Sequence, residues 1–185
     1  MLIDNYDSFT YNLVQQIRAI ESFDVFVKRN DEIDINDLKR NFNFDKIVIS
    51  PGPKTPSKAG VSNAIIAEFY AVIPILGVCL GMQCINEVFG GKTIRSPLPL
   101  HGKTSLISHS GRDIFKNIPQ NMEVARYHSL IIDDISNDFE IIAHTKDNIP
   151  MAIKHKKYPI FGVQFHPESF MTPYGNILME NFLNI

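Results

Sequence analysis

Cys79 has the sequence setting of a catalytic nucleophile. It lies within Gly77-Val78-Cys79-Leu80-Gly81, which matches the G-x-nucleophile-x-G elbow with cysteine in the place of serine. A nucleophile at a sharp strand-to-helix turn has a strained backbone, and glycines on either side remove collisions with the sheet and the helix. The turn would expose the sulfur at the helix N-terminus, whose partial positive charge favours a thiolate. On this pentapeptide alone, a buried cysteine in a glycine-bounded turn remains the alternative interpretation.

His166 and Glu168 have the spacing of a base and the carboxylate that orients it. They lie in His166-Pro167-Glu168, and residues two apart in an extended segment project to the same side. Pro167 keeps the segment extended, because it fixes its own φ and biases the residue before it away from helix. The imidazole can then reach a thiol while the carboxylate holds the imidazole. This is the arrangement of a nucleophile–base–orienter triad.

The other cysteine and most other histidines have no comparable setting. Cys84 falls inside the expected helix after Cys79 without flanking glycines, so we expect it to be a packing residue. The spacing of the histidines, without clustered cysteines or carboxylates, indicates no metal site. The histidines that we expect in loops or on the surface are His101, His109, His144 and His155.

The elements that must position these side chains alternate in the first half of the chain. Short apolar runs, β-branched at 24–28 and 46–50, predict strands at 2–3, 24–28, 46–50 and 75–78, and helical spacing predicts helices at 9–20, 64–68 and 81–89. Asp7 or Ser8 is the expected cap of the first helix, on which Asn12 and Gln16 interrupt the apolar face. The alternation predicts a parallel sheet with helices on both faces. Cys79 would then lie at the carboxyl edge, where doubly wound folds bind ligands.

The second half contains candidate strands with few helical stretches between them. They fall near 103–107, 122–126, 130–133, 140–144 and 151–155, and we expect them to be antiparallel additions to the main sheet. The run 160–164 predicts another buried strand, and 175–183 predicts a closing helix. Without repeats or a linker, the 185 residues predict one domain over 1–185. Its fold would be three-layer α/β, with a mostly parallel open sheet, helices on both faces and antiparallel additions in the second half.

Composition narrows the class of protein. A net charge of −2 without a basic run argues against a nucleic-acid or acidic-membrane partner, and no apolar stretch is long enough to span a bilayer. Two cysteines cannot form a disulfide framework, so a reducing compartment is expected. The chain opens directly into an expected strand without a signal segment, and these features together predict a cytoplasmic protein.

Seven blocks of sequence, in order along essentially the whole chain, resemble those of class I (triad-type) glutamine amidotransferases. The most similar members are the small subunits of anthranilate synthase and 4-amino-4-deoxychorismate synthase. The resemblance implies the flavodoxin-like three-layer fold of that family. The blocks are LIDNYDSFTYN at 2–12, ISPGP at 49–53, ILGVCLGMQ at 75–83, GGK at 90–92, HGKTS at 101–105, RYHSL at 126–130 and GVQFHPES at 162–169.

Eight residues acquire roles through this resemblance. The implied reaction is hydrolysis of the glutamine side-chain amide through a cysteinyl thioester. His128 would be a neighbour in the substrate loop rather than a second base. The catalytic residues would be Cys79, His166 and Glu168, the oxyanion donors the backbone N–H groups of Gly52 and Leu80, and the glutamine-binding residues Gln83, Ser129 and Leu130.

The resemblance also implies a second polypeptide. The chain is too short for a second active site of synthase size, so the ammonia acceptor is expected on a chorismate-binding subunit, and glutamine hydrolysis is expected to be weak until that subunit docks. No cofactor is implied in this chain, and Mg²⁺ is expected on the partner synthase. Two residues depart from the family pattern: Met82, where many relatives have histidine, and Lys54, where smaller residues are frequent. Met82 should alter packing rather than chemistry, and the effect of Lys54 on access to the site is open.

Several alternatives remain at this point. An amidase or peptidase could share the elbow and the sheet, although GVQFHPES disfavours it. A silent scaffold that only regulates a synthase, or an amidotransferase subunit of nucleotide or histidine synthesis, would also fit the fold. Within the chorismate branch, the sequence does not separate tryptophan synthesis from folate synthesis.

Overall fold

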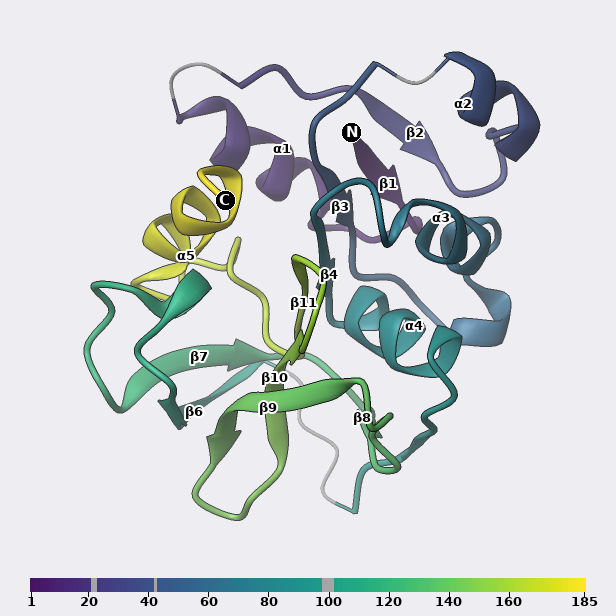
Figure 1. The fold of residues 1–185 in the computed structure, drawn as a ribbon. Helices are drawn as coiled ribbons and strands as arrows, with labels where there is room; N and C mark the ends of the chain where they lie inside the picture. Colours follow the sequence, from purple (N-terminus) through teal and green to yellow (C-terminus); the bar gives the residue numbers. More distant parts are fainter. Residues whose placement is uncertain (21–22, 42, 98–101) are drawn as a thin grey trace.

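A nine-stranded sheet runs through the residues that this computed structural model describes, which are 1–20, 23–41, 43–97 and 102–185 (Figure 1). Five neighbouring strands are parallel and form the part of the sheet predicted from the first half of the chain and the run at 160–164. In sheet order they are β2 (Val27–Arg29), β1 (Leu2–Asp4), β3 (Ile47–Ile49), β4 (Ile75–Val78) and β11 (Ile160–Val163).

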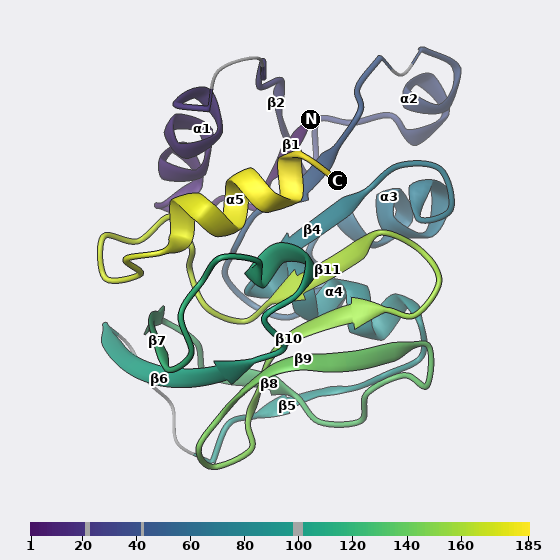
Figure 2. The same cartoon turned by 60° about the vertical axis from the view of Figure 1, so that its left-hand side comes forward.

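Antiparallel strands extend this sheet beyond β11, as expected from the second half (Figure 2). A separate two-stranded ribbon lies below them and carries part of the candidate substrate loop. In order, the added strands are β10 (Pro150–His155), β9 (Phe139–Thr145), β6 (Lys103–His109) and β7 (Met122–Arg126). The ribbon pairs β5 (Thr93–Arg95) with β8 (Leu130–Ile132).

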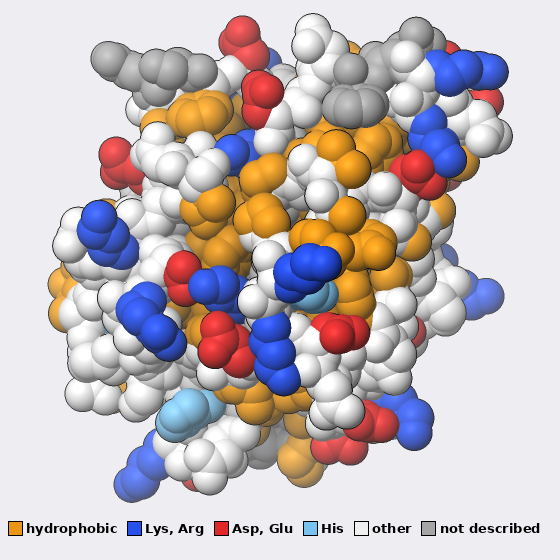
Figure 3. Space-filling model, in the orientation of Figure 1, with side chains coloured by type: hydrophobic (Ala, Val, Ile, Leu, Met, Phe, Trp, Pro, Cys, Tyr) orange, Lys and Arg blue, Asp and Glu red, His pale blue; other side chains and the backbone are white. Residues whose placement is uncertain are grey.

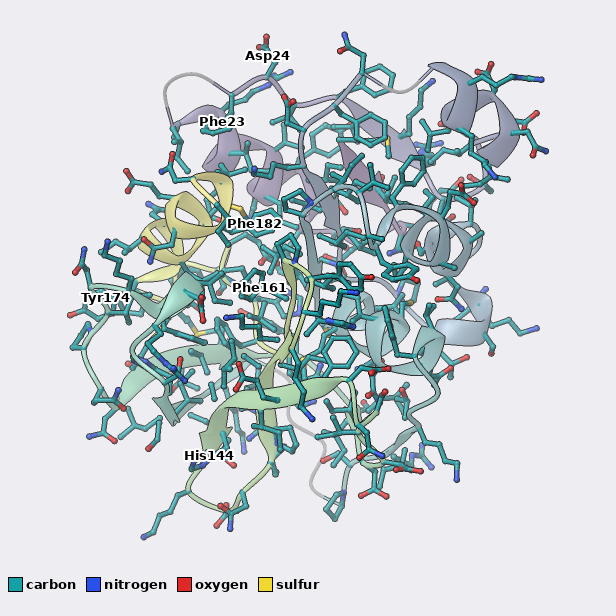
Figure 4. All side chains as sticks on the ribbon, in the orientation of Figure 1. Phe23, Asp24, His144, Phe161, Tyr174 and Phe182 are labelled. Atoms are coloured by element: carbon teal, nitrogen blue, oxygen red, sulfur yellow. The ribbon has the colours of Figure 1, made fainter. Side chains whose placement is uncertain are left out.

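Helices cover both faces of the parallel strands, which makes three layers (Figure 1). Successive strand residues point to opposite faces, so Leu2 belongs to one buried cluster and Ile3 to the other. On the first face, Phe161 of β11 meets Phe182 edge to face, with 6.4 Å between ring centroids (Figure 4). That face carries α1 (Thr10–Arg18) and α5 (Gly175–Leu183), and the other carries α2 (Ile35–Asn41), α3 (Ser62–Phe69) and α4 (Leu80–Val88).

The structure corrects three local predictions. Helix α1 begins at Thr10, and neither Asp7 nor Ser8 caps it through a side chain; instead the Asp7 carboxylate accepts the N–H of Phe9. Gln16 does more than interrupt the apolar face, because its amide donates to the carbonyl of Pro167 at 2.9 Å. Strand β2 covers 27–29 rather than 24–28, and the short elements α2 and β5 were not predicted. None of the helices in the described ranges combines the length and hydropathy needed to cross a membrane.

Candidate active site

Cys79 occupies the strained turn that its sequence setting predicts. Its φ is +52° and its ψ is −100°, between the last residue of β4 and the first residue of α4. A Cβ on Gly77 would lie 2.4 Å from the backbone of Gly81, and one on Gly81 would lie 2.5 Å from the carbonyl oxygen of Ile49. The backbone N–H of Cys79 donates to the carbonyl of Val163 at 2.7 Å. The side chain is only 8% exposed, so it is less open than expected, although it lines a cavity.

His166 reaches the same edge of the sheet because β11 lies beside β4. The two strands are parallel, with Val163 opposite Val78, so the segments that follow them leave the sheet side by side. The loop that carries His166 is fixed by its N–H, which donates to the carbonyl of Ala125 at 3.2 Å. It is also fixed by the hydroxyl of Thr172, which donates to the carbonyl of His166 at 2.7 Å.

The imidazole of His166 is held by Glu168. The distance between Nδ1 of His166 and Oε1 of Glu168 is 2.6 Å, and the two side chains are 3% and 0% exposed. Burial, the largest effect, opposes the imidazolium, but hydrogen bonding and charge interactions with Cys79 and Glu168 raise the pKa of His166 well above 6.5. Among the described residues, the buried Nε2 of His166 makes no hydrogen bond of good geometry.

Two aromatic rings enclose the imidazole. The centroid of Tyr127 lies 5.0 Å from that of His166, and the centroid of Phe9 lies 6.2 Å from it, both with edge-to-face geometry. Phe9 and Tyr127 also contact each other at 5.5 Å. Packing against these rings limits the rotation of the buried imidazole.

A cavity of about 360 Å³ opens beside the sulfur. Within the described residues, the backbone N–H groups of Gly52 and Leu80 donate to no protein acceptor, so both are available to an oxyanion at the start of α4. All the glutamine-binding residues implied by the resemblance line this cavity. Its lining consists of Gly52, Pro53, Lys54, Thr55, Cys79, Leu80, Gln83, Tyr127, His128, Ser129 and Leu130.

Asn5 fixes the loop that carries Gly52, a role that sequence reasoning missed. Its backbone N–H donates to Oγ of Ser50 at 2.9 Å, and its side-chain amide donates to the carbonyl of Ser50 at 3.0 Å. The amide oxygen of Asn5 accepts from Asn30 and Ser62, both at 2.8 Å. A Cβ on Gly52 would lie 2.5 Å from the Cβ of Asn5, so only glycine allows the loop to pack this closely.

A buried polar network fixes the substrate loop. Nε of Arg126 donates to Nε2 of His128 at 3.0 Å, and Nδ1 of His128 lies 2.9 Å from the carbonyl oxygen of Leu130. These partners describe a neutral His128 with its proton on Nδ1, consistent with a positioning neighbour rather than a second base. Gln83 donates to the same Leu130 carbonyl at 3.3 Å. Burial lowers the pKa of Arg126.

Other singled-out residues fall in varied settings. Cys84 is fully buried in α4 as expected, and burial raises the pKa of its thiol. His144 is exposed on β9 (Figure 4), but His155 is 5% exposed, which contradicts its prediction as a loop or surface residue. Met82 is fully buried and packs on Gly162. His101 lies outside the described residues.

Lys54 is the second residue that departs from the family pattern. Lys54 is exposed, has a φ of +75° and lines the cavity beside the sulfur.

A larger hollow of about 550 Å³ lies elsewhere, among residues such as Phe23, Val25 and Phe44, and the described residues that line it include no cysteine or histidine. Hydrophobic side chains gather on the upper half of the face drawn in Figure 3. Among the described residues, no group of three or more His, Cys, Asp or Glu side chains is placed to hold a metal ion.

Comparison with known proteins places this geometry in a family. A family model described as glutamine amidotransferase class-I matches residues 1–185. The chain is 49% identical over 187 residues to "Anthranilate synthase component 2" of Cyanophora paradoxa, covering 100% of this chain and 97% of that protein. It is 46% identical over 185 residues to "Aminodeoxychorismate/anthranilate synthase component 2" of Bacillus subtilis, covering 99% and 94%. In two longer multifunctional relatives, the chain spans 32% and 24% of their length.

The fold is also shared with a solved structure. A Thermoplasma acidophilum protein, provisionally assigned as one of the subunits of GMP synthase, superposes with a TM-score of 0.87 at 27% identity, covering 99% of this chain and 90% of that one. This agrees with the three-layer architecture predicted from the sequence. Both the full-length family match and the relatives near half identity lead to one conclusion: the chain belongs to the class-I glutamine amidotransferases.

Proposed function

We propose that this chain hydrolyses L-glutamine through Cys79, His166 and Glu168 and delivers the ammonia to a chorismate-using synthase subunit. The observation that carries the proposal is the contact of 2.6 Å between His166 and Glu168 beside a cysteine strained at the elbow. The cavity at the sulfur and the two available N–H groups complete the requirements for acyl transfer.

The first half of the reaction forms a thioester. The Cys79 thiolate attacks the side-chain amide carbon of glutamine, and the carbonyl oxygen becomes an oxyanion that accepts the N–H groups of Gly52 and Leu80. His166, whose raised pKa favours the imidazolium, gives its Nε2 proton to the amide nitrogen, so that nitrogen leaves as ammonia. Glu168 keeps Nδ1 engaged and Nε2 directed at the reacting atoms.

The second half hydrolyses the thioester. His166, now neutral, takes a proton from water at Nε2 as the water oxygen attacks the γ-glutamyl carbon. The tetrahedral intermediate uses the same two N–H donors. The carbon–sulfur bond then breaks, which releases glutamate and regenerates the Cys79 thiolate with the His166 imidazolium. Each turnover therefore consumes glutamine and water and yields glutamate and ammonia.

The substrate's α-groups would be held by the loop at 128–130 and by Gln83. Both amide hydrogens of Gln83 are used within the protein, toward Leu130 and Gln164. Its side-chain oxygen accepts from no described residue, so it is the group available to the α-ammonium of glutamine. The backbone of Ser129 and Leu130 lines the opposite part of the cavity.

The destination of the ammonia follows from chemistry and from the relatives. Free ammonia is mostly protonated at neutral pH and then not nucleophilic, so a synthase gains from receiving it directly. Relatives of nearly the same length are named as component 2 of anthranilate synthase or of aminodeoxychorismate/anthranilate synthase, which supports a component 1 partner for this chain. An amidotransferase role in nucleotide synthesis has the structural likeness in its favour, but at lower identity.

The test uses the chain together with its synthase subunit, chorismate and either glutamine or an ammonium salt. The Cys79→Ser variant should lose glutamine-dependent amination and keep ammonium-dependent amination, while the matched Cys84→Ser variant should keep both. An unchanged glutamine-dependent rate in Cys79→Ser would overturn the proposal. The product assigns the branch: anthranilate means tryptophan synthesis, and aminodeoxychorismate means folate synthesis.

Two further parts of the proposal concern the setting of the reaction. Mg²⁺ would act on the partner synthase rather than on this chain, so EDTA should stop chorismate amination by the complex while glutamine hydrolysis continues. Both cysteines are free thiols, which supports a reducing, cytoplasmic compartment. Fractionation of cells that express the tagged full chain tests that location.

A further inference from the structure

Gln164 contacts the sulfur of Cys79 from the buried side. It directly follows β11, as Cys79 directly follows β4, and the register of these parallel strands makes the two residues neighbours. The amide nitrogen of Gln164 donates to Sγ of Cys79 at 3.5 Å. Gln164 is fully buried, and the described residues that line the cavity include Gln83 but not Gln164. Its amide therefore contacts the sulfur and not the substrate.

The orientation of this amide is fixed by Gln83. The carbonyl oxygen of Leu130 can only accept, so the group of Gln83 that lies 3.3 Å from it must be the amide nitrogen. The same nitrogen lies 3.2 Å from Oε1 of Gln164, which must therefore be the accepting oxygen. If the amide of Gln164 were flipped, its NH2 group would face the NH2 group of Gln83, and its oxygen would face the sulfur of Cys79. Consequently the N–H of Gln164 faces Cys79.

We propose that Gln164 stabilises the Cys79 thiolate by donating to it, and that Gln83 positions Gln164 for this purpose. This inference rests on the proposed function of Cys79 as the nucleophile. Hydrogen bonds to a charged group in a buried site are stronger than neutral ones. Because Gln83 also bonds to Leu130 in the substrate loop, the relay Leu130–Gln83–Gln164–Cys79 connects the loop that binds glutamine to the atom that attacks it.

The experiment measures alkylation of Cys79 by iodoacetamide across a range of pH, with the modified peptide followed by mass spectrometry. This reagent is small and neutral and needs no glutamine site, and the pH dependence of its rate, rather than the absolute rate, reports on the thiolate. Gln164→Met keeps the length of the side chain but removes the donor. We expect alkylation at neutral pH to slow about tenfold and the pH profile to move to higher pH by about one unit. Gln83→Met should move it in the same direction by less.

Control variants separate this role from a structural one. Gln120→Met makes the same substitution at an exposed residue that bonds to His109 and should keep the original pH profile. If Gln164→Met does not fold, Gln164→Glu keeps the shape, and its carboxylate should suppress alkylation further as it ionises. An unchanged pH profile in a folded Gln164 variant overturns the proposal, even if Cys79→Ser still abolishes glutamine use. Failure of the parent chain to use glutamine would overturn the proposed function without altering the alkylation result.

Discussion

At the residue scale, the chemistry depends on one carboxylate that water does not reach. The side chain of Glu168 is fully buried, and among the described residues only one of its oxygens has a partner, at 2.6 Å from His166. A buried carboxylate held this closely fixes which nitrogen of the imidazole carries the proton toward the reacting atoms.

Glu168→Gln should lower kcat for glutamine by about 10³–10⁴-fold with little change in KM, because an amide at this position can hold the wrong tautomer of His166. Steady-state glutamate release measures the effect. Ammonium-dependent amination by the complex should not change. Glu180→Gln, at an exposed carboxylate of α5, is the matched control and should have parent activity. A kcat within threefold of the parent would show that Glu168 does not orient the base.

At the element scale, helix α1 supports the loop that carries the candidate base. The amide nitrogen of Gln16 donates to the carbonyl of Pro167 and to the side chain of Asn176, both at 2.9 Å. Gly175 makes room for this arrangement, since a Cβ there would collide with the same Pro167 carbonyl. The loop at 166–168 is thus held from α1 and from the start of α5.

Gln16→Leu should destabilise the protein by about 1–3 kcal/mol and lower kcat, because the Pro167 carbonyl loses its buried donor and the loop gains freedom. Urea unfolding and glutamine turnover measure the two effects. Gln15→Leu changes the same residue type one position earlier, on the exposed side of α1, and should lie within about 0.5 kcal/mol of the parent. Equal behaviour of the two variants would contradict the support role.

Elements could be predicted from the sequence where burial on both faces requires an apolar run. Strands β4 and β11 are short apolar runs because both faces of a parallel sheet are covered, and that pattern is visible without a structure. Helix α2 and strand β5 are short and carry little apolar periodicity, so they were missed. Asn5 and Gln164 are neutral amides whose partners are distant in sequence. Nothing in the sequence indicated their roles except that both lie within the blocks that resemble the amidotransferase family.

At the scale of the whole molecule, we propose that the chain unfolds as one unit. The two buried clusters share the same central strands, so unfolding the strands under one cluster also exposes the other cluster to water. A single urea transition that coincides by fluorescence and by circular dichroism is expected, and two separate transitions would contradict it.

His155 should make this stability fall in acid. Its Nδ1 accepts the backbone N–H groups of Lys157 and Tyr158, both at 3.0 Å, and its ring packs against Phe89 and Phe139. Burial lowers the pKa of His155 below its ordinary 6.5, so the unfolded chain binds the proton first. The contribution is complete above about 6.5 and is lost as the pH falls toward the lowered folded-state pKa.

Urea unfolding between about pH 5 and 7.5 tests this, since His155→Gln should reduce the acid slope and His144→Gln, at an exposed histidine, should not. If the acid slope of His155→Gln matches that of the parent, burial of the neutral His155 ring is not the cause of the loss of stability in acid.

His166 should act in the opposite direction at the other end of the pH range. Its pKa is raised in the folded state, so the folded chain binds the proton more tightly than the unfolded chain does. The resulting stability is complete below about 6.5 and is lost as the pH rises through the raised value. His166→Gln should therefore flatten the alkaline side of the stability profile while leaving the acid side, which depends on His155, as it was. The same variant should not hydrolyse glutamine. The proton that makes His166 an imidazolium, and so stabilises the fold, is the proton that His166 gives to the departing ammonia. A parent alkaline slope in His166→Gln would mean that Cys79 and Glu168 do not hold the imidazolium in the folded protein.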